Sequence, residues 1–288
     1  MPGLGKLTSM KCRKIERAIF VKHDTPMKNI ASFDRVYYGA EFCEHLIPNV
    51  AEVRQVYEQI LIRNKKMTFV TPYVTNKGLQ SLGNIFTYLN RLGVNMEIVF
   101  NDWGVFRILQ RQYSNLVPVL GRLLTKQKRD PLVQQVVFER QTPGKSYEIN
   151  SKKMYLYYPR SVSSSIRNHF RGSLINVPLF QKFLLSNSVR RMEIDNLLWD
   201  MKVMCTKNIG ISVYLPFGYV TTTRLCGLIN LSYAKCKKEC EKQSIVLHVK
   251  NTPSPLYVSG NTIFYKSRIP SLKYLRAHRI DRIILQSL

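Results

Sequence analysis

Short runs of β-branched and aromatic residues alternate with amphipathic segments along the first two thirds of the chain. The runs RVYYG, MTFVTP and MEIVFND predict strands at Arg35–Gly39, Met67–Pro72 and Met96–Asp102, and further strands are expected near Leu116, Arg190 and Ile209. Apolar residues recurring every three or four positions predict helices between them, at Val50–Asn64, Lys77–Arg91 and Val105–Tyr113. We expect Asn76 to cap the second helix.

Strands and helices that alternate at this pace predict a parallel sheet built from βαβ units. Six or more such strands favour a (β/α) TIM-type barrel, incomplete or distorted in places, over the alternative of a doubly wound open sheet. We expect a single domain over 1–288, with the barrel core over 15–240. Residues 245–288 are expected to add three strands and a basic, barrel-closing helix that contains Leu272, Leu275, Ile280 and Ile283.

Charge changes the picture more than hydrophobicity does. The 288 residues are 45% hydrophobic, which allows a sizeable core, but 44 lysines and arginines face only 18 acidic residues, for a net charge of +26. Such a field attracts nucleic acid, anionic lipid or an acidic partner, or it is simply solvated. The sequence contains neither a signal-peptide pattern nor a run of transmembrane length, so we expect a cytoplasmic protein.

The cysteines are the strongest chemical signal in the sequence. Three of the six fall within fifteen positions, in TTTRLCGLINLSYAKCKKEC, as Cys226, Cys236 and Cys240. In a (β/α) barrel the loops after the strands share one rim, so Cys43, in GAEFCEH, can join them. Converging thiolates in a reducing compartment bind zinc or an iron–sulfur cluster. Spacing alone leaves this open, because cysteines four apart also stack on a packed helix face.

The remaining thiols and histidines are assigned simpler roles. Cys205 lies at helical spacing with Leu198 and Met201 and is expected in the core. Cys12 is treated as incidental, because it lies in a basic N-terminal segment. His45, two residues after Cys43, is expected at the surface or supporting the site rather than as a ligand.

Several motifs together resemble peptidase family U32, the collagenase-like family. VTNKGLQSL, MEIVFNDWGVFRIL, PVLGRLL and the late Arg-Leu-Cys before two paired cysteines resemble its motifs over most of residues 15–240, most closely in a short, single-domain, UbiV-like branch. The resemblance implies a barrel and a 4Fe–4S cluster bound by Cys43, Cys226, Cys236 and Cys240, with zinc as the alternative. The gap before Cys236 is shorter than in the family, so Cys226 is its least typical ligand.

The resemblance implies a subunit of an oxygen-independent hydroxylation system of the anaerobic ubiquinone-biosynthesis type, in a hetero-oligomer with a second family member. One alternative is an RNA-modifying protein that hydroxylates tRNA or rRNA, as other, longer family members do, which suits the +26 charge. Another is a metal-stabilised binding barrel without catalysis.

Ordinary catalytic motifs are absent from the sequence. It contains no GxSxG or HExxH, so a peptidase activity has no support, and any enzyme would be a hydroxylase component. Asn101 and Asp102, in NDWG, are candidates for positioning a substrate or a water molecule at the barrel mouth. Capping of the helix that begins near Trp103 is the stronger expectation for Asp102.

The charge generates a first prediction. If the basic surface serves RNA, the affinity for a single-stranded RNA should fall with roughly one power of salt concentration for each phosphate contact. A salt titration of binding, followed by fluorescence anisotropy, measures that slope. Weak binding at low salt, or a flat titration, would leave the +26 charge without a nucleic-acid role.

Overall fold

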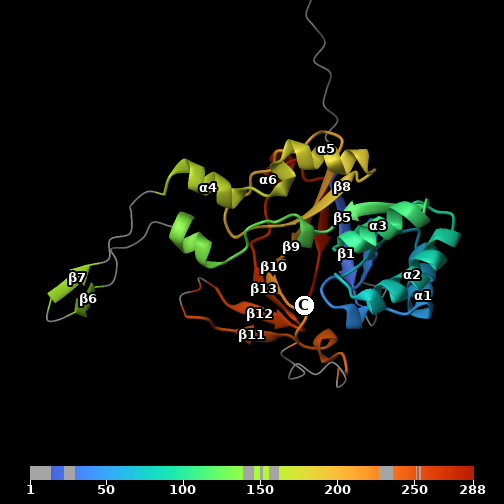
Figure 1. The fold of residues 1–288 in the computed structure, drawn as a ribbon, viewed down its shortest axis with the longest axis horizontal. Coiled ribbons are helices and arrows are strands. Elements are labelled where there is room, and N and C mark those ends of the chain that lie inside the picture. The colour runs from blue at the N-terminus through green and yellow to red at the C-terminus, as the bar shows by residue number, and fades with distance from the viewer. Residues whose placement is uncertain are drawn as a thin grey trace, which may run out of the picture.

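Eight parallel strands close into a barrel in chain order (Figure 1). The computed structural model describes residues 14–22, 30–138, 146–149, 152–155, 162–226, 236–250, 252 and 254–288. The barrel strands are β1 (Glu16–Val21), β2 (Arg35–Gly39), β3 (Lys66–Val70), β4 (Met96–Phe100), β5 (Leu116–Leu120), β8 (Arg191–Asp195), β9 (Gly210–Leu215) and β14 (Arg282–Leu285). Because β14 pairs with β1, the predicted barrel is confirmed and the open sheet is excluded.

Helices cover only part of this barrel. They are α1 (Val50–Ile62), α2 (Asn76–Arg91), α3 (Trp103–Gln112), α4 (Ser164–Arg171), α5 (Pro178–Ser186) and α6 (Leu272–Ala277). In Figure 1, α1, α2 and α3 lie together on one side, and α1 contacts β3, α2 contacts β5 and α3 contacts β4 and β5. Among the described residues no α-helix joins β1 to β2 or β8 to β9, so the barrel departs from the regular repeat, in line with the expected distortion. None of the described helices is long and apolar enough to cross a bilayer.

The connection from β5 to β8 is long and contains shorter elements. These are η3 (Arg122–Leu124), a π-helical turn η4 (Gln134–Phe138), a hairpin of β6 (Ser146–Ile149) and β7 (Lys152–Tyr155), and η5 (Leu174–Asn176). The hairpin lies away from the barrel in Figure 1.

A second, antiparallel sheet continues from the carboxyl end of β9. Its order is β10 (Phe217–Thr222), β13 (Thr262–Lys266), β12 (Leu256–Ser259) and β11 (Ile245–Leu247). Only Pro216 separates β9 from β10, so this sheet starts at the carboxyl rim of the barrel. The three strands predicted after residue 245 therefore form a layer with β10 over that rim.

The predicted closing helix is wrong beyond Ala277. Arg279 has a left-handed backbone (φ 58°), and the chain then forms β14, the last strand of the barrel. Burial in β14 follows a period of two, with Arg282 and Ile284 buried and the residues after each partly exposed. The apolar residues that suggested one helix in fact belong to a short helix and a strand.

The predicted cap of α2 is also wrong. Thr75 is the N-cap residue and Asn76 is the first helical residue. The Thr75 hydroxyl does not cap the helix, because together with the Thr75 amide it donates to the Glu44 carboxylate, at 2.9 and 2.7 Å. Glu44 begins the short helix η2 (Glu44–Leu46), so a contact between two rim loops replaces the local cap.

Side chains fill the barrel interior in layers, as is typical of the fold. The middle layer is mainly apolar and contains Ala18, Tyr37, Val70, Val99, Val119, Tyr214 and Ile284. The layer at the amino ends of the strands is ionic. There Arg282 donates to Glu16 at 2.6 Å and to both Glu97 oxygens at 2.6 and 2.9 Å, while Arg35 donates to Glu16 at 2.9 Å.

This ionic layer joins β1, near the start of the chain, to β14, near its end. Burial alone would raise the pKa of Glu97, but the hydrogen bonds and charge of Arg282, with Arg35 and Arg191 nearby, lower it to about 2. A carboxyl with a lowered pKa stabilises the fold above its ordinary pKa, and that contribution is lost as the pH falls through its folded value.

We expect Arg282→Ala to cost about 3 kcal/mol, because it leaves the partly buried Glu16 and Glu97 without their main partner. Urea denaturation followed by circular dichroism measures this loss. Arg54→Ala is the matched control, since Arg54 pairs with Glu58 on the exposed face of α1 and should unfold like the wild type. Equal midpoints for Arg282→Ala and Arg54→Ala would contradict a supporting role for the ionic layer.

Candidate functional site

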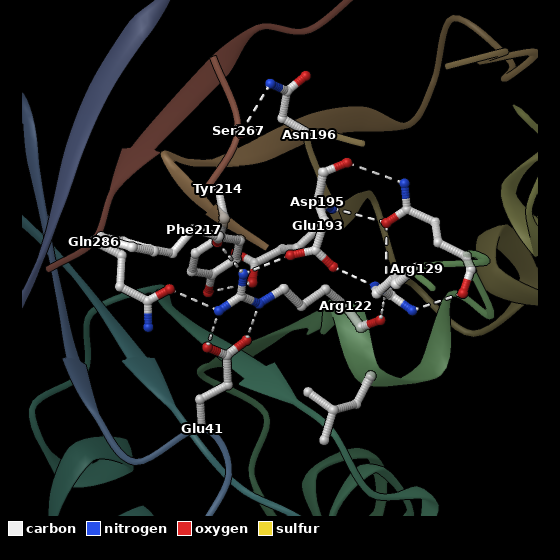
Figure 2. Close-up of polar contacts among 12 residues, drawn as sticks. Glu41, Arg122, Arg129, Glu193, Asp195, Asn196, Tyr214, Phe217, Ser267 and Gln286 are labelled. Atoms are coloured by element: carbon white, nitrogen blue, oxygen red, sulfur yellow. Dashed lines mark hydrogen bonds and ion pairs between the residues drawn. The ribbon is translucent and has the colours of Figure 1, made fainter. Parts of the chain in front are cut away.

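A fully buried arginine organises the carboxyl mouth of the barrel (Figure 2). Arg122 follows β5, and its guanidinium binds both oxygens of Glu41, which follows β2, at 2.6 and 2.7 Å. It also donates to Asp195, at the end of β8, at 2.6 Å and to Gln286, beyond β14, at 2.7 Å. The guanidinium therefore links the loops that follow four barrel strands.

A second arginine completes this network. Arg129 donates to the other oxygen of Asp195 at 2.5 Å and to the Arg122 carbonyl at 2.7 Å. The Arg122 guanidinium stacks on the Tyr214 ring at 3.7 Å, and that of Arg129 lies 4.2 Å from the Tyr219 ring. Two cations thus face two carboxylates in a site closed to solvent, where unpaired charge would be costly.

Glu193 lies below this network, inside the barrel. The Tyr214 hydroxyl donates to its Oε2 at 2.8 Å, and its Oε1 is buried without a hydrogen-bond partner among the described residues. Burial, followed by the nearby charge of Glu41, raises the pKa of Glu193 from its usual 4.5 to about 8. A third negative charge beside a balanced network is disfavoured, so this carboxyl is mostly protonated at neutral pH.

Four cysteines line one cavity of about 180 Å³ above this mouth. Cys43 follows β2, Cys226 follows β10, and Cys236 and Cys240 lie before β11. Segments more than 180 residues apart thus bring the predicted ligands to one site. Apolar lining comes from Phe20, Tyr38, Phe42, Leu46, Phe264 and Leu288, and Glu41 connects the cavity to the buried ionic network.

The donor set of this cavity consists of soft thiol ligands. Burial and the neighbouring cysteines raise the pKa of the Cys240 thiol to about 12, and burial also raises the pKa of Cys43. A bound cation would reverse this, because coordination deprotonates thiols. No group of three or more His, Cys, Asp or Glu residues within the described ranges is arranged to hold a single metal ion.

A second cavity, of about 270 Å³, lies on the other side of Cys43. Phe42, Cys43 and Asn261 line both cavities, so they form the wall between them. His45 lines this outer cavity and not the one with the four cysteines. Cys205 is partly buried and packs against the main core, in a segment without the helix that its spacing suggested, and Cys12 lies outside the described residues.

Asn101 and Asp102 line neither cavity. Asn101 is buried, with its amide donating to the Thr71 carbonyl at 2.9 Å and its Oδ1 accepting from the Leu123 amide at 3.2 Å. Asp102 caps α3 by accepting from the amides of Gly104 and Val105, at 2.6 and 3.2 Å, as expected for this residue. Both side chains are thus occupied in shaping the rim.

Sequence reasoning missed the ionic network, although two of its members lie in quoted motifs. Arg122 is the arginine of LGR, and Glu41 lies two residues before Cys43 in GAEFC. A carboxylate and an arginine that each directly follow a barrel strand are a usable signal, because such residues share one rim. Their pairing partners Asp195 and Gln286 could not be identified without the strand order.

Comparisons with known proteins give matches among solved structures alone. No protein-family model matches the chain, and no curated protein matches it. The U32 peptidase Mk0906 aligns with 9% identity and a TM-score of 0.45, covering 100% of this chain and 97% of its own. Human YKL-39, described as a pseudo-chitinase that retains chitooligosaccharide binding, has 9% identity and a TM-score of 0.35, covering 94% and 92%. The Trichuris suis chitinase TsES1 has 10% identity and a TM-score of 0.35, covering 94% and 91%.

The raised pKa of Glu193 predicts a pH-dependent stability. Because the folded state binds a proton that the unfolded state has lost, stability should fall as the pH rises from about 4.5 to about 8. Glu193→Gln, which stays neutral, should remove this contribution and flatten the profile measured by thermal unfolding. Glu58→Gln, on the exposed face of α1, is the control and should keep the wild-type slope. An unchanged slope in Glu193→Gln would show that Glu193 is ionised in the fold.

Proposed function

We propose that this chain is an iron–sulfur protein in which Cys43, Cys226, Cys236 and Cys240 bind a 4Fe–4S cluster. The observation that carries the proposal is the convergence of these four thiols on one cavity at the carboxyl mouth of the barrel. Chemistry in (β/α) barrels takes place at this face, and four cysteine ligands are the usual complement of such a cluster.

The arrangement of the four cysteines around a cavity favours a cluster over zinc. Tetrahedral zinc, with Zn–S bonds of about 2.3 Å, requires its four sulfurs to lie about 3.8 Å apart. A 4Fe–4S cluster binds each thiolate through a different iron, so its cysteines are spread more widely. Among the described residues, no three or more His, Cys, Asp or Glu side chains are arranged around a single ion, and the four cysteines surround a cavity. Both observations fit the wider separation of a cluster's ligands.

The surrounding residues suit a negatively charged group. Lys22 and Lys238 line the cavity, and Lys22 donates to the Glu241 carbonyl at 3.0 Å, next to Cys240. Their charges would offset part of the negative charge of four thiolates. When bound, a cluster supplies one-electron chemistry or a structural crosslink. The apolar side chains around it would limit access of water and oxygen.

The activity and the partner in this proposal rest on the sequence motifs. The resemblance to the UbiV-like branch of family U32 suggests a subunit of an oxygen-independent hydroxylation system that works with a second family member. Hydroxylation of RNA is the second candidate function, and the observation that favours it is the net charge of +26. RNA that co-purifies with the chain would favour the second, and a bound prenylated aromatic compound the first.

Anaerobic purification should yield a brown protein with about four iron and four sulfide per chain. Cys43→Ala should lose iron as severely as Cys240→Ala, because incomplete ligation leaves an iron open to attack. Metal analysis and visible absorbance measure both. Cys205→Ala is the control, since Cys205 packs against the core away from the cavity, and it should retain its iron.

Two outcomes would contradict the proposal. A colourless protein with one zinc per chain would replace the cluster with a metal ion. Wild-type iron content in Cys43→Ala would show that Cys43 is not a ligand. The site would then consist of the other three cysteines and a different fourth ligand.

A further inference from the structure

A single hairpin turn contacts the segments that carry three of the four cysteines. The turn Gly260–Asn261 joins β12 to β13, with Ser259 paired to Thr262 on either side. Gly260 has a positive φ of 60°, as the first central position of a type II′ hairpin requires. Both turn residues line the cysteine cavity, and Asn261 also lines the outer one.

The Asn261 side chain ties two cysteine loops together. Its amide nitrogen donates to the Phe42 carbonyl at 2.9 Å, directly before Cys43, and to the Thr223 carbonyl, three residues before Cys226. The Asn261 backbone carbonyl also accepts from the Thr223 backbone amide at 3.1 Å. These bonds join positions about 180 residues apart in the chain, with a third segment as the bridge.

Tyr73 reinforces the same junction from the loop after β3. Its hydroxyl donates to the Thr223 carbonyl at 2.6 Å and lies 3.2 Å from the Asn261 amide nitrogen. The Thr223 carbonyl therefore accepts from two side chains. An amide that donates to two backbone carbonyls cannot be replaced by a carboxylate, which has no proton to donate when ionised.

The turn also touches the third cysteine. A methyl group added at Gly260 would lie 3.3 Å from both Cβ and Sγ of Cys240. The Ser259 hydroxyl donates to the Cys240 carbonyl at 3.4 Å. Close approach of the turn backbone to the Cys240 sulfur is possible because position 260 has no side chain.

We infer that the Gly260–Asn261 turn sets the relative positions of Cys43, Cys226 and Cys240, with Asn261 as the main positioning residue of the thiol site. The inference rests on the proposed function, because metal binding gives this positioning its purpose. The contacts that position the thiols are made by the protein alone. Side chains that orient ligands in this way affect metal affinity by about 10–100-fold in other proteins.

The decisive variant is Asn261→Asp, which keeps the size of the side chain and replaces both donated hydrogens with negative charge against two carbonyls. In the chain reconstituted anaerobically with iron and sulfide, competition with an iron chelator, followed through visible absorbance, should show at least about tenfold weaker binding of the cluster. Peptide-resolved alkylation of the reduced, metal-free chain should show faster modification of Cys43 and Cys226, while Cys205 reacts at the wild-type rate.

Asn115→Asp is the matched control. Asn115 also donates to a backbone carbonyl, that of Asn90 at 3.1 Å, but it lies before β5 at the opposite end of the barrel. It should lower thermal stability comparably and leave cluster affinity and thiol reactivity unchanged. Equal effects of the two variants, or wild-type affinity and alkylation rates in Asn261→Asp, would overturn the inference.

The alkylation measurement separates this inference from the proposed function. If the wild type binds no iron, the proposed cluster fails, and alkylation still tests whether the turn positions the thiols. If the wild type binds a cluster and Asn261→Asp binds it equally well, the positioning role fails and the cluster stands.

Discussion

The buried guanidinium of Arg122 holds together the carboxyl mouth of the barrel. It joins Glu41, Asp195 and Gln286, which lie at the carboxyl ends of three different strands, to its own position after β5. Such a group is stable in the interior only when its donors and charge are satisfied, so each partner must be in place. The register of the strands and the geometry of the mouth therefore depend on one another.

This constraint extends to the cysteine cavity through a short stretch of chain. Glu41 is held by Arg122, and Cys43 lies only two residues further on, so the loop after β2 enters the cavity from a fixed point. The antiparallel sheet places the Gly260–Asn261 turn on the other side of that loop. The irregular loop that carries Cys43 is thus held on one side by the Glu41–Arg122 ion pair and on the other by the Asn261 amide.

Polar groups divide the barrel interior into two ionic levels with an apolar level between them. Glu16, Arg35, Glu97 and Arg282 occupy the amino ends of the strands, and Arg122, Arg129 and Asp195 the carboxyl ends. Glu193 lies between these levels with one oxygen unpartnered, and its raised pKa follows from that position. The four amino-end residues line neither of the two cavities described above and support the fold, whereas the carboxyl-end level is joined through Arg122 to Glu41, which lines the cysteine cavity.

The sequence by itself determined the barrel class, most strand positions and the cysteines that deserve chemical interest. Short continuous apolar runs identify the barrel strands because these strands are buried on both faces, and this held from Arg35–Gly39 to Leu116–Leu120. The same reasoning failed at Arg282–Leu285, where a charged residue faces inward and its partners lie at distant positions in the chain. A local sequence pattern cannot predict a buried arginine whose ion-pair partners lie far away in the chain.

Only the tertiary structure decided how the rim is assembled. It replaced the expected Asn76 cap with a contact between Thr75 and Glu44, assigned Asn101 to backbone support, and placed Asn261 between two cysteine loops. Each of these side chains bonds to a group at least 30 residues away in sequence. Their partners are set by barrel closure, which brings together strand ends that no local pattern relates.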